Sequence, residues 1–214
     1  MKKIMFNDRY ALTDAAIEGI KTNTRRIEGG DQFQLAANSA EEFFYEKDAG
    51  YIVMCRQGVE IFSHKCRYKL GEVVAVAQNY FEIRNYIIGE DFDGTLSHVY
   101  GLDDDFTEVV NLAGWGNKMF VRADLMPHSI RITGIKCEQL RNISDEECLR
   151  EGISESWYES TDATTYGYAD EEKGTAVEFD TPREAFASLI DKVSGQGTWE
   201  WNPWVVAYEF ELVK

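Results

Sequence analysis

The sequence predicts an α+β fold built on a curled sheet or small barrel with short flanking helices. Segments in which apolar and polar residues alternate, such as residues 129–136, indicate strands, whereas capping motifs at Ser144 and Thr181 indicate short helices. These segments do not follow one another in alternating strand–helix order, which argues against a doubly wound parallel sheet. With 214 residues, of which 44% are hydrophobic, the chain is expected to form a single domain over residues 1–214.

The first expected elements are a strand at residues 1–6 and a helix at Asp8–Glu18. Apolar residues recur at helical spacing from Leu12 onward, and Asp8 is a suitable N-cap. Gly19 can adopt the left-handed conformation that commonly ends a helix. A turn and then a strand at Thr24–Ile27 should follow.

The next elements are predicted from a capping motif and a hairpin turn. Ser39 with Glu42 matches a capping box, which predicts a helix that continues through Tyr45. Gln57-Gly58 is typical of a tight turn between two strands. The strands expected here are Tyr51–Arg56, Val59–Ser63 and a buried strand at residues 71–77.

The C-terminal half is expected to hold two strands and two helices. Ser129–Lys136 alternates as a strand does, with one interruption at Gly134. Ser144 and Glu147 form a second capping box, which opens a helix that runs to Glu151. Thr181-Pro182 marks another helix start. That helix should end near Gly195, and a closing strand is expected at Trp204–Val213.

Two acidic segments, residues 80–115 and 155–180, have few periodic apolar positions and are expected to be insertions in the domain. Within the first, Asp91–Leu96 matches the first motif of haloacid-dehalogenase-type phosphatases, where one aspartate is a nucleophile and the next a general acid. That family places the motif on the first strand of a Rossmann-like sheet. Because the alternating strand–helix pattern is missing here, we favour an insertion over a phosphatase site.

Composition restricts the classes of function. A net charge of −16 argues against broad electrostatic attraction to nucleic acid, although a local basic cleft remains compatible with it. The sequence has neither a run of about 18 apolar residues nor a signal-peptide-like start, so a cytoplasmic protein without membrane contact is expected. The four cysteines form no Cys-x-x-Cys pair. We therefore expect buried, reduced thiols and neither a metal site nor a cofactor.

The highest local concentration of positive charge and hydroxyls lies in Gly19–Arg26, with the sequence Gly-Ile-Lys-Thr-Asn-Thr-Arg-Arg. In a helical turn Lys21 and Thr24 would share a face, whereas in an extended strand they would point to opposite faces. Joint chemistry of the two therefore requires a turn. The alternative is a solvent-exposed corner between a helix and a strand.

Gly19-x-Lys21-x-x-Thr24-x-Arg26 resembles the signature of ASCH domains, which belong to the PUA-like superfamily of small β-barrels associated with RNA. The chain is most similar to ASCH-related proteins of phages and prophages, which share a Lys-Thr-x-Thr-Arg-Arg motif near the start. Where these relatives often have Arg-Glu after a Gly-Asp strand, this chain has Ala77-Gln78. The other segments that carry the resemblance are Gly71-Glu72, Met126-Pro127, Ser129–Thr133, Ile143–Gly152 and Gly195–Val205.

The resemblance implies a possible activity, since one bacterial ASCH group hydrolyses N(4)-acetylcytidine with lysine, threonine and glutamate. Lys21, Thr24 and Glu151 match these catalytic positions. A threonine hydroxyl needs a base, and a lysine can be that base when burial or neighbouring cations lower its pKa. Glu151 would hold the lysine or assist the leaving amine. The alternative is an ordinary Lys21–Glu151 ion pair beside a strand threonine.

Two further classes of function compete with catalysis. In a binding module for RNA or a nucleoside, Arg25 and Arg26 would contact phosphate, and Tyr80 or Trp199 would stack on a base. The alternative for the aromatic residues is packing in the core. In a non-catalytic phage accessory protein, the acidic insertions would contact a protein partner. The sequence leaves the oligomeric state open.

Overall fold

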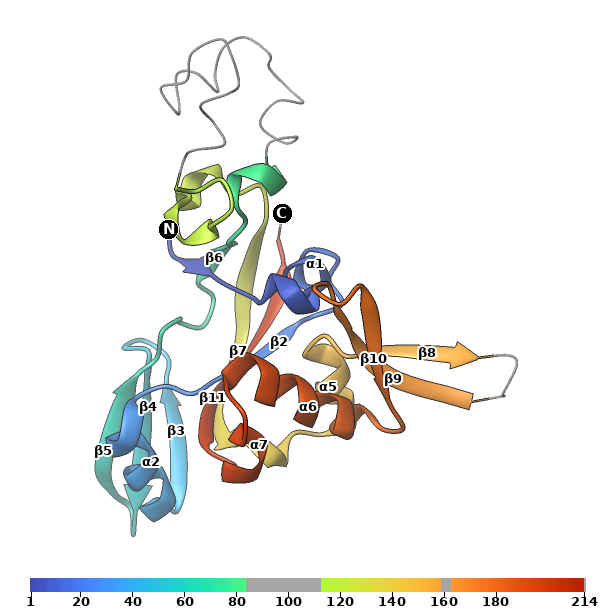
Figure 1. Cartoon of the computed structure of the whole chain (residues 1–214). Coiled ribbons are helices and arrows are strands. Elements are labelled where there is room, and N and C mark those ends of the chain that lie inside the picture. The colour runs from blue at the N-terminus through green and yellow to red at the C-terminus, as the bar shows by residue number, and fades with distance from the viewer. Residues whose placement is uncertain (84–112, 159–162, 214) are drawn as a thin grey trace. The chain divides into compact units, whose positions relative to one another are not determined.

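The computed structural model describes residues 1–83, 113–158 and 163–213 (Figure 1). Its mixture of helices and strands confirms the α+β class. The chain divides into two compact units, of which the first comprises Met1–Phe6, Val73–Ile130 and Val213–Lys214. The second comprises Asn7–Glu72 and Arg131–Leu212. The expected single domain over residues 1–214 stays a prediction.

The first unit is held together by its N-terminal strand. β1 (Lys3–Ile4) pairs in parallel with β6 (Val73–Val76). The ammonium group of Lys3 donates to the backbone carbonyls of Lys118, Met119 and Val121 at 2.6–3.0 Å. These carbonyls belong to or follow the short helix η3 (Lys118–Phe120), and η4 (Ala123–Leu125) comes next. The core of this unit contains Ala75, Ile83, Val121 and Met126.

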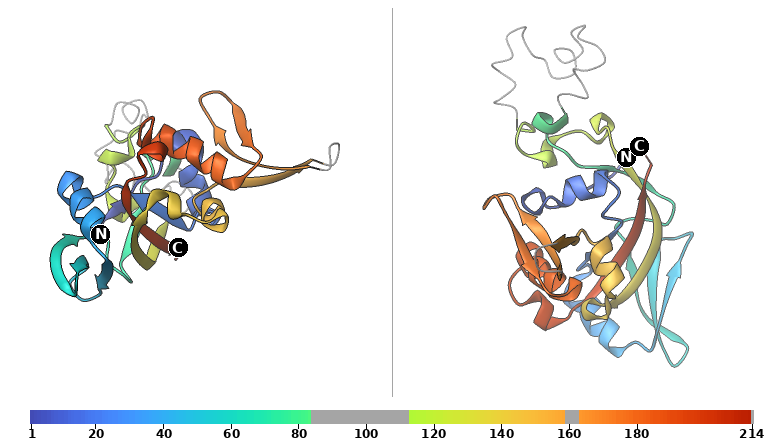
Figure 2. Two further views of the ribbon diagram at one scale, coloured as in Figure 1. Left: turned by 90° about the horizontal axis from the view of Figure 1, so that it is seen from below. Right: turned by 90° about the vertical axis from the view of Figure 1, so that its right-hand side faces the viewer.

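The second unit contains three neighbouring strands of a sheet, in the order β7-β11-β2. β2 (Asn23–Arg26) pairs antiparallel with β11 (Trp204–Leu212). β7 (Ser129–Gln139), which begins in the first unit, lies beside β11 as a long curved strand (Figure 2). A Cβ on Gly134 would lie 2.7 Å from Glu209 Oε2 and 3.2 Å from Glu209 Cβ, so a larger residue there would require the Glu209 side chain to move.

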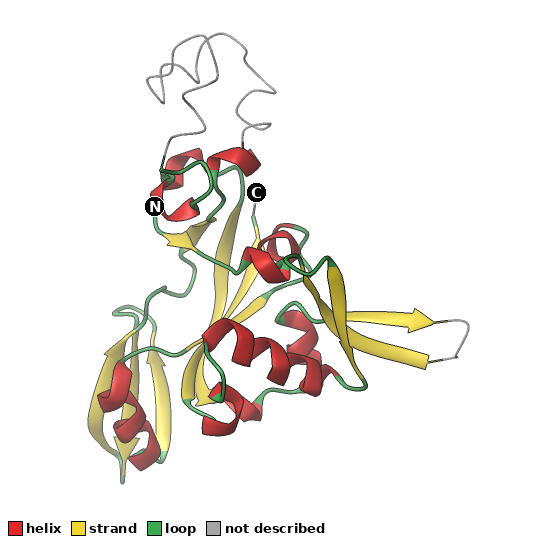
Figure 3. Ribbon diagram, in the orientation of Figure 1, coloured by secondary structure: helices red, strands yellow, loops and turns green. Residues whose placement is uncertain are grey.

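A second sheet consists of β3 (Glu42–Glu46), β4 (Tyr51–Arg56) and β5 (Val59–Lys65), with α2 (Gly30–Ser39) along one face (Figure 3). The predicted turn at Gln57-Gly58 joins β4 to β5, and both of its residues have positive φ. The predicted helix from Ser39 through Tyr45 is wrong. Ser39 ends α2 and donates to the Leu35 carbonyl, because fully buried Phe33 and Ala37 pack the preceding segment as a helix.

The helices of the second unit are short. The predicted helix at Asp8–Glu18 is divided into η1 (Asp8–Tyr10) and α1 (Leu12–Ile17) at Ala11, which is left-handed. The capping box at Ser144 opens α5 (Asp145–Arg150) as expected, after η5 (Leu140–Asn142). The predicted Thr181 cap opens α6 (Pro182–Ser194), which is followed by α7 (Thr198–Trp201).

The predicted insertion at residues 155–180 coincides with a third sheet. β8 (Ser154–Tyr158), β9 (Ala163–Asp170) and β10 (Thr175–Phe179) pair antiparallel with β9 in the centre (Figure 1). Tyr168 on β9 is only 2% exposed and packs edge-on against Tyr10. This segment therefore contributes a side chain to the interior of the second unit.

The strand orders in the described residues are linear, so the sheets are open and do not close into a barrel. Of the other predicted insertion, residues 84–112 lie outside the described residues, and so does the phosphatase-like segment Asp91–Leu96.

Candidate active site

Lys21 is placed by the turn that follows α1. Gly19 has φ +74°, and the backbone N–H of Lys21 donates to the Ala15 carbonyl at 2.8 Å. The Lys21 side chain is 3% exposed, and its Nζ donates to Glu151 Oε2 at 2.7 Å and to the Glu151 carbonyl at 2.6 Å. Two residues 130 positions apart thus form a buried ion pair, as the sequence analysis proposed for these two residues.

Glu151 is placed by the end of α5, where it is the C-cap. Gly152 follows with φ +104°, and a Cβ there would lie 2.9 Å from Leu12 Cδ2, so glycine permits the close approach of α1. The backbone N–H of Thr22 donates to the Arg150 carbonyl at 2.9 Å. Lys21 and Thr22 therefore both satisfy carbonyls that the end of a helix leaves without intrahelical partners.

The environment of Lys21 lowers its pKa below the ordinary value of 10.5. Burial is the largest cause, since it penalises the charged form. The contact with Glu151 acts in the opposite direction, and the charges of Arg26 and Arg25 lower the pKa further. Burial and neighbouring cations are the two causes that were expected to lower the pKa of a lysine base at this position.

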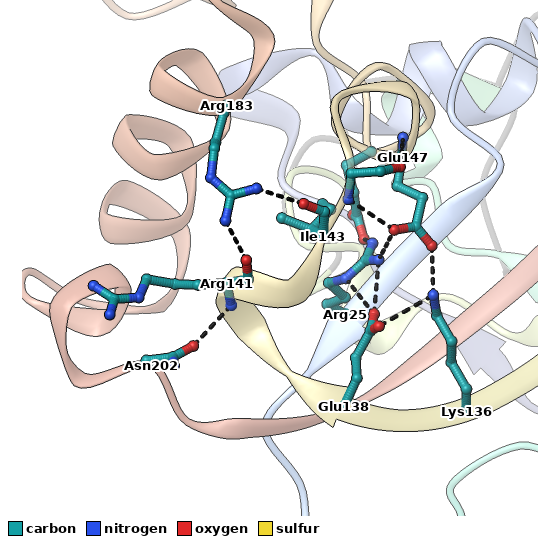
Figure 4. Close-up of polar contacts among 10 residues, drawn as sticks. Arg25, Lys136, Glu138, Arg141, Ile143, Glu147, Arg183 and Asn202 are labelled. Atoms are coloured by element: carbon teal, nitrogen blue, oxygen red, sulfur yellow. Dashed lines mark hydrogen bonds and ion pairs between the residues drawn. The ribbon is translucent and has the colours of Figure 1, made fainter.

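Arg25 is surrounded by three glutamates, two of which, Glu138 and Glu147, are labelled in Figure 4. Its side chain is 1% exposed. Nε lies 3.0 Å from Glu138 Oε1, Nη1 lies 2.9 Å from Glu151 Oε1, and Nη2 lies 3.0 Å from Glu147 Oε2. The guanidinium that was expected to contact phosphate therefore contacts carboxylates from β7 and α5.

Lys136 on β7 completes this cluster of charges. Its ammonium group lies 3.1 Å from Glu138 Oε2 and also contacts Glu147 Oε1. We define the charge cluster as Lys21, Arg25, Lys136, Glu138, Glu147 and Glu151. Its three cations and three anions balance, which offsets much of the cost of removing so many charges from water.

Thr24 is 6% exposed on β2, where it is paired in register with Tyr208 of β11. Side chains alternate along a strand, so Thr24 shares one face of β2 with Arg26, while Arg25 occupies the other. Thr24 therefore lies on the face of β2 opposite to Arg25 and the glutamates that contact Arg25. Lys21 precedes the strand and is within electrostatic range of both faces, since Arg26 and Arg25 both lower its pKa.

The two aromatic candidates are packed against other side chains. Trp199 in α7 lies edge-on to Phe186, with a distance of 6.2 Å between ring centroids, and the guanidinium carbon of Arg183 is 5.3 Å from its ring. Tyr80 belongs to the first unit and packs against its core. In the same unit Ala77 is fully buried, and Gln78 Oε1 is 3.0 Å from His128 Nδ1.

The cysteines show no sign of activated thiols. All four are unpaired, and burial raises the pKa of Cys66, Cys137 and Cys148 to about 12. His64, near Cys66 in sequence, lies 3.1 Å from Glu28 through Nε2. Within the described ranges, no group of three or more His, Cys, Asp and Glu side chains is arranged to hold a metal ion.

None of the described helices combines the length and apolar character needed to cross a membrane.

Sequence reasoning did not identify Lys136, Glu138 and Glu147 as site residues. Glu147 was assigned only to the capping box, which it does form with Ser144. Lys136 and Glu138 continue the same strand face as Ile130 and Ile132, which are fully buried. The signal in the sequence that could have identified Lys136 and Glu138 is that they are charged residues on a strand face whose first residues are buried in the core.

Comparison of the chain with protein-family models, with curated proteins and with solved structures finds no match.

Proposed function

We propose that this chain is a PUA-like protein that binds an acylated nucleoside and hydrolyses its amide bond, with N(4)-acetylcytidine as the first candidate substrate. The observation that carries the proposal is the buried Lys21 amine, 2.7 Å from Glu151 and with a lowered pKa. At a given pH, a lysine with a lowered pKa holds a larger fraction of its amine uncharged and can accept a proton more readily than an ordinary lysine. The threonine of the Lys-x-x-Thr motif, Thr24, would be the nucleophile.

In this mechanism Thr24 Oγ forms a bond to the acyl carbon while its proton passes to Lys21 Nζ. The carbon–nitrogen bond then breaks, and Lys21 returns the proton to the leaving amine. Water hydrolyses the resulting Thr24 ester and releases the carboxylic acid. Glu151 accepts a hydrogen bond from Lys21 Nζ, which orients the amine, and it stabilises the ammonium that forms when Lys21 takes the proton.

The test is turnover of N(4)-acetylcytidine and a small panel of other acylated nucleosides by purified protein, followed by chromatography. Thr24→Val keeps the shape of the side chain and removes only the nucleophile, so we expect at least about a 100-fold loss of kcat. Thr22→Val is the matched control in the same motif and should retain turnover. Activity should rise with pH and reach half its maximum below the ordinary lysine value of 10.5.

Full turnover by Thr24→Val would remove Thr24 from the mechanism. If the wild-type protein binds an acylated nucleoside or an RNA without turnover, a binding module is the correct function instead. If it does neither, the proposal is wrong and an accessory protein with a protein partner is favoured.

A further inference from the structure

Both carboxylate oxygens of Glu151 are engaged by different cations. Oε2 accepts a hydrogen bond from Lys21 at 2.7 Å, and Oε1 accepts one from Arg25 at 2.9 Å. A carboxylate held at both oxygens has little rotational freedom. The position of Glu151 against the Lys21 amine therefore depends on Arg25.

Arg25 is itself fixed by contacts on its other nitrogens. Nε and Nη2 lie 3.0 Å and 2.8 Å from Glu138 Oε1, and Nη2 lies 3.0 Å from Glu147. A planar guanidinium presents five donors in a fixed fork, which a lysine ammonium cannot reproduce. The geometry around Arg25 thus requires arginine and not merely a positive charge.

We propose that Arg25 is a positioning residue, which fixes Glu151 against the Lys21 amine and is itself held by Glu138 and Glu147. The part of this inference that concerns catalysis rests on the proposed function, whereas the geometric part does not. The charged groups that face Lys21 are Glu151 from the end of α5 and Arg25 and Arg26 from β2. Those that face Arg25 are Glu138 from β7 and Glu147 and Glu151 from α5, with Lys136 bound to the first two.

The first variant is Arg25→Lys, which keeps the charge and removes the fork. Glu151 then loses the donor that fixes Oε1 and is no longer held against Lys21. Because the contact with Glu151 raises the pKa of Lys21, the Lys21 titration midpoint should fall. NMR detection of the Lys21 side chain measures this midpoint without any substrate. If the chain is the proposed hydrolase, kcat should fall on the order of 10–100-fold with KM little changed, because the base is misplaced.

The second variant is Glu138→Gln, which keeps the side-chain shape and removes one buried anion. Loss of an anion near coupled cations should lower the Lys21 titration midpoint. A lower midpoint alone would increase the fraction of uncharged amine and raise activity near neutral pH. A fall in kcat despite the lower Lys21 midpoint would therefore show that the substitution disturbs the positioning of Glu151 through Arg25 and does not act through charge alone.

Arg131→Lys is the matched control, because Arg131 forms an exposed ion pair with Glu211 at 3.1 Å. This substitution should leave the Lys21 titration midpoint and kcat unchanged. A Lys21 midpoint in Arg25→Lys that equals or exceeds that of the wild type overturns the proposal. Should Arg25→Lys fail to fold, an unchanged midpoint in Glu138→Gln overturns it. Lack of turnover by the wild-type protein would contradict only the proposed function, since the Lys21 midpoint measured by NMR needs no substrate and tests by itself whether Arg25 fixes Glu151.

Discussion

Glu147 is held in its ionised form by its neighbours. Burial alone would raise the pKa of Glu147, but the hydrogen bonds from Lys136 and from the Ser144 backbone outweigh it, together with the charges of Arg25 and Lys136. The pKa falls from 4.5 to about 2. A depressed pKa in the folded state stabilises the fold above the unfolded pKa, and this stability is lost as the pH falls toward the folded pKa.

We therefore expect Glu147→Gln to lower the free energy of unfolding at pH 7 by about 1.5–3 kcal/mol, the usual range for hydrogen bonds to a charged group. The difference from the wild type should narrow as the pH falls through the window from 4.5 to about 2. Chemical denaturation of both proteins at several pH values measures this difference in the free energy of unfolding. Glu146→Gln, an exposed neighbour in α5, is the control. A difference that stays constant with pH would contradict the assignment.

At the residue scale the sequence was sufficient for local motifs and for one long-range pair. The Lys21–Glu151 contact was expected from motif positions in a resembling family, and the structure shows it. The carboxylate partners of Arg25 could not be predicted, because they depend on how β7 and α5 pack around β2. Exposed phosphate-binding arginines and buried paired arginines have the same local sequence.

At the scale of elements, the predictions that were correct depended on short-range chemistry. The Thr181 cap, the Ser144 capping box and the Gln57-Gly58 turn are each specified by residues three positions apart or fewer. The capping-box pattern at Ser39 failed, because Glu42 lies on β3 and pairs with Cys55 of β4. Strand pairing across the chain overrode a local helix signal there.

The β8–β9–β10 sheet was not foreseen, because its acidic residues hide a strand pattern. Tyr168 is deeply buried, with its hydroxyl 2.8 Å from Ser188 Oγ. It packs between Tyr10 and Phe179, with ring-centroid distances of 5.5 Å and 6.3 Å. One side chain therefore connects this sheet to η1 and α6.

Tyr168→Ala should destabilise the protein by about 3–5 kcal/mol, as expected for removal of a buried aromatic ring. Tyr168→Phe removes only the hydroxyl contact and should cost about 0.5–1.5 kcal/mol. Tyr158→Ala on β8 is the control, because Tyr158 is 42% exposed and should cost about 1 kcal/mol or less. Thermal and denaturant unfolding of the three variants gives the ranking. Equal losses for Tyr168 and Tyr158 would show that β9 is not anchored through Tyr168.

At the scale of the whole molecule, the balance of charge bears on the ligand class. The chain carries a net charge of −16, yet two of the three cations in its basic motif, Lys21 and Arg25, are directed at glutamates. Composition predicted the overall repulsion of polyanions. It could not predict that these two cations are neutralised internally, since this depends on glutamates more than 100 residues away in the sequence.

Under the proposed function, these charges favour an uncharged nucleoside over RNA as the ligand. Binding of a nucleoside releases few counterions, so its Kd should change by less than about twofold between about 50 and about 200 mM salt. An oligoribonucleotide that contains the same acylated base should bind more weakly than the nucleoside, because the acidic surface repels its phosphates. The difference in Kd between the nucleoside and the oligoribonucleotide should become smaller with added salt, since screening weakens that repulsion. Titration calorimetry with the Thr24→Val variant measures both ligands without turnover. Tighter binding of the oligonucleotide at low salt, with a steep loss as salt is added, would instead indicate phosphate contacts and an RNA-binding surface.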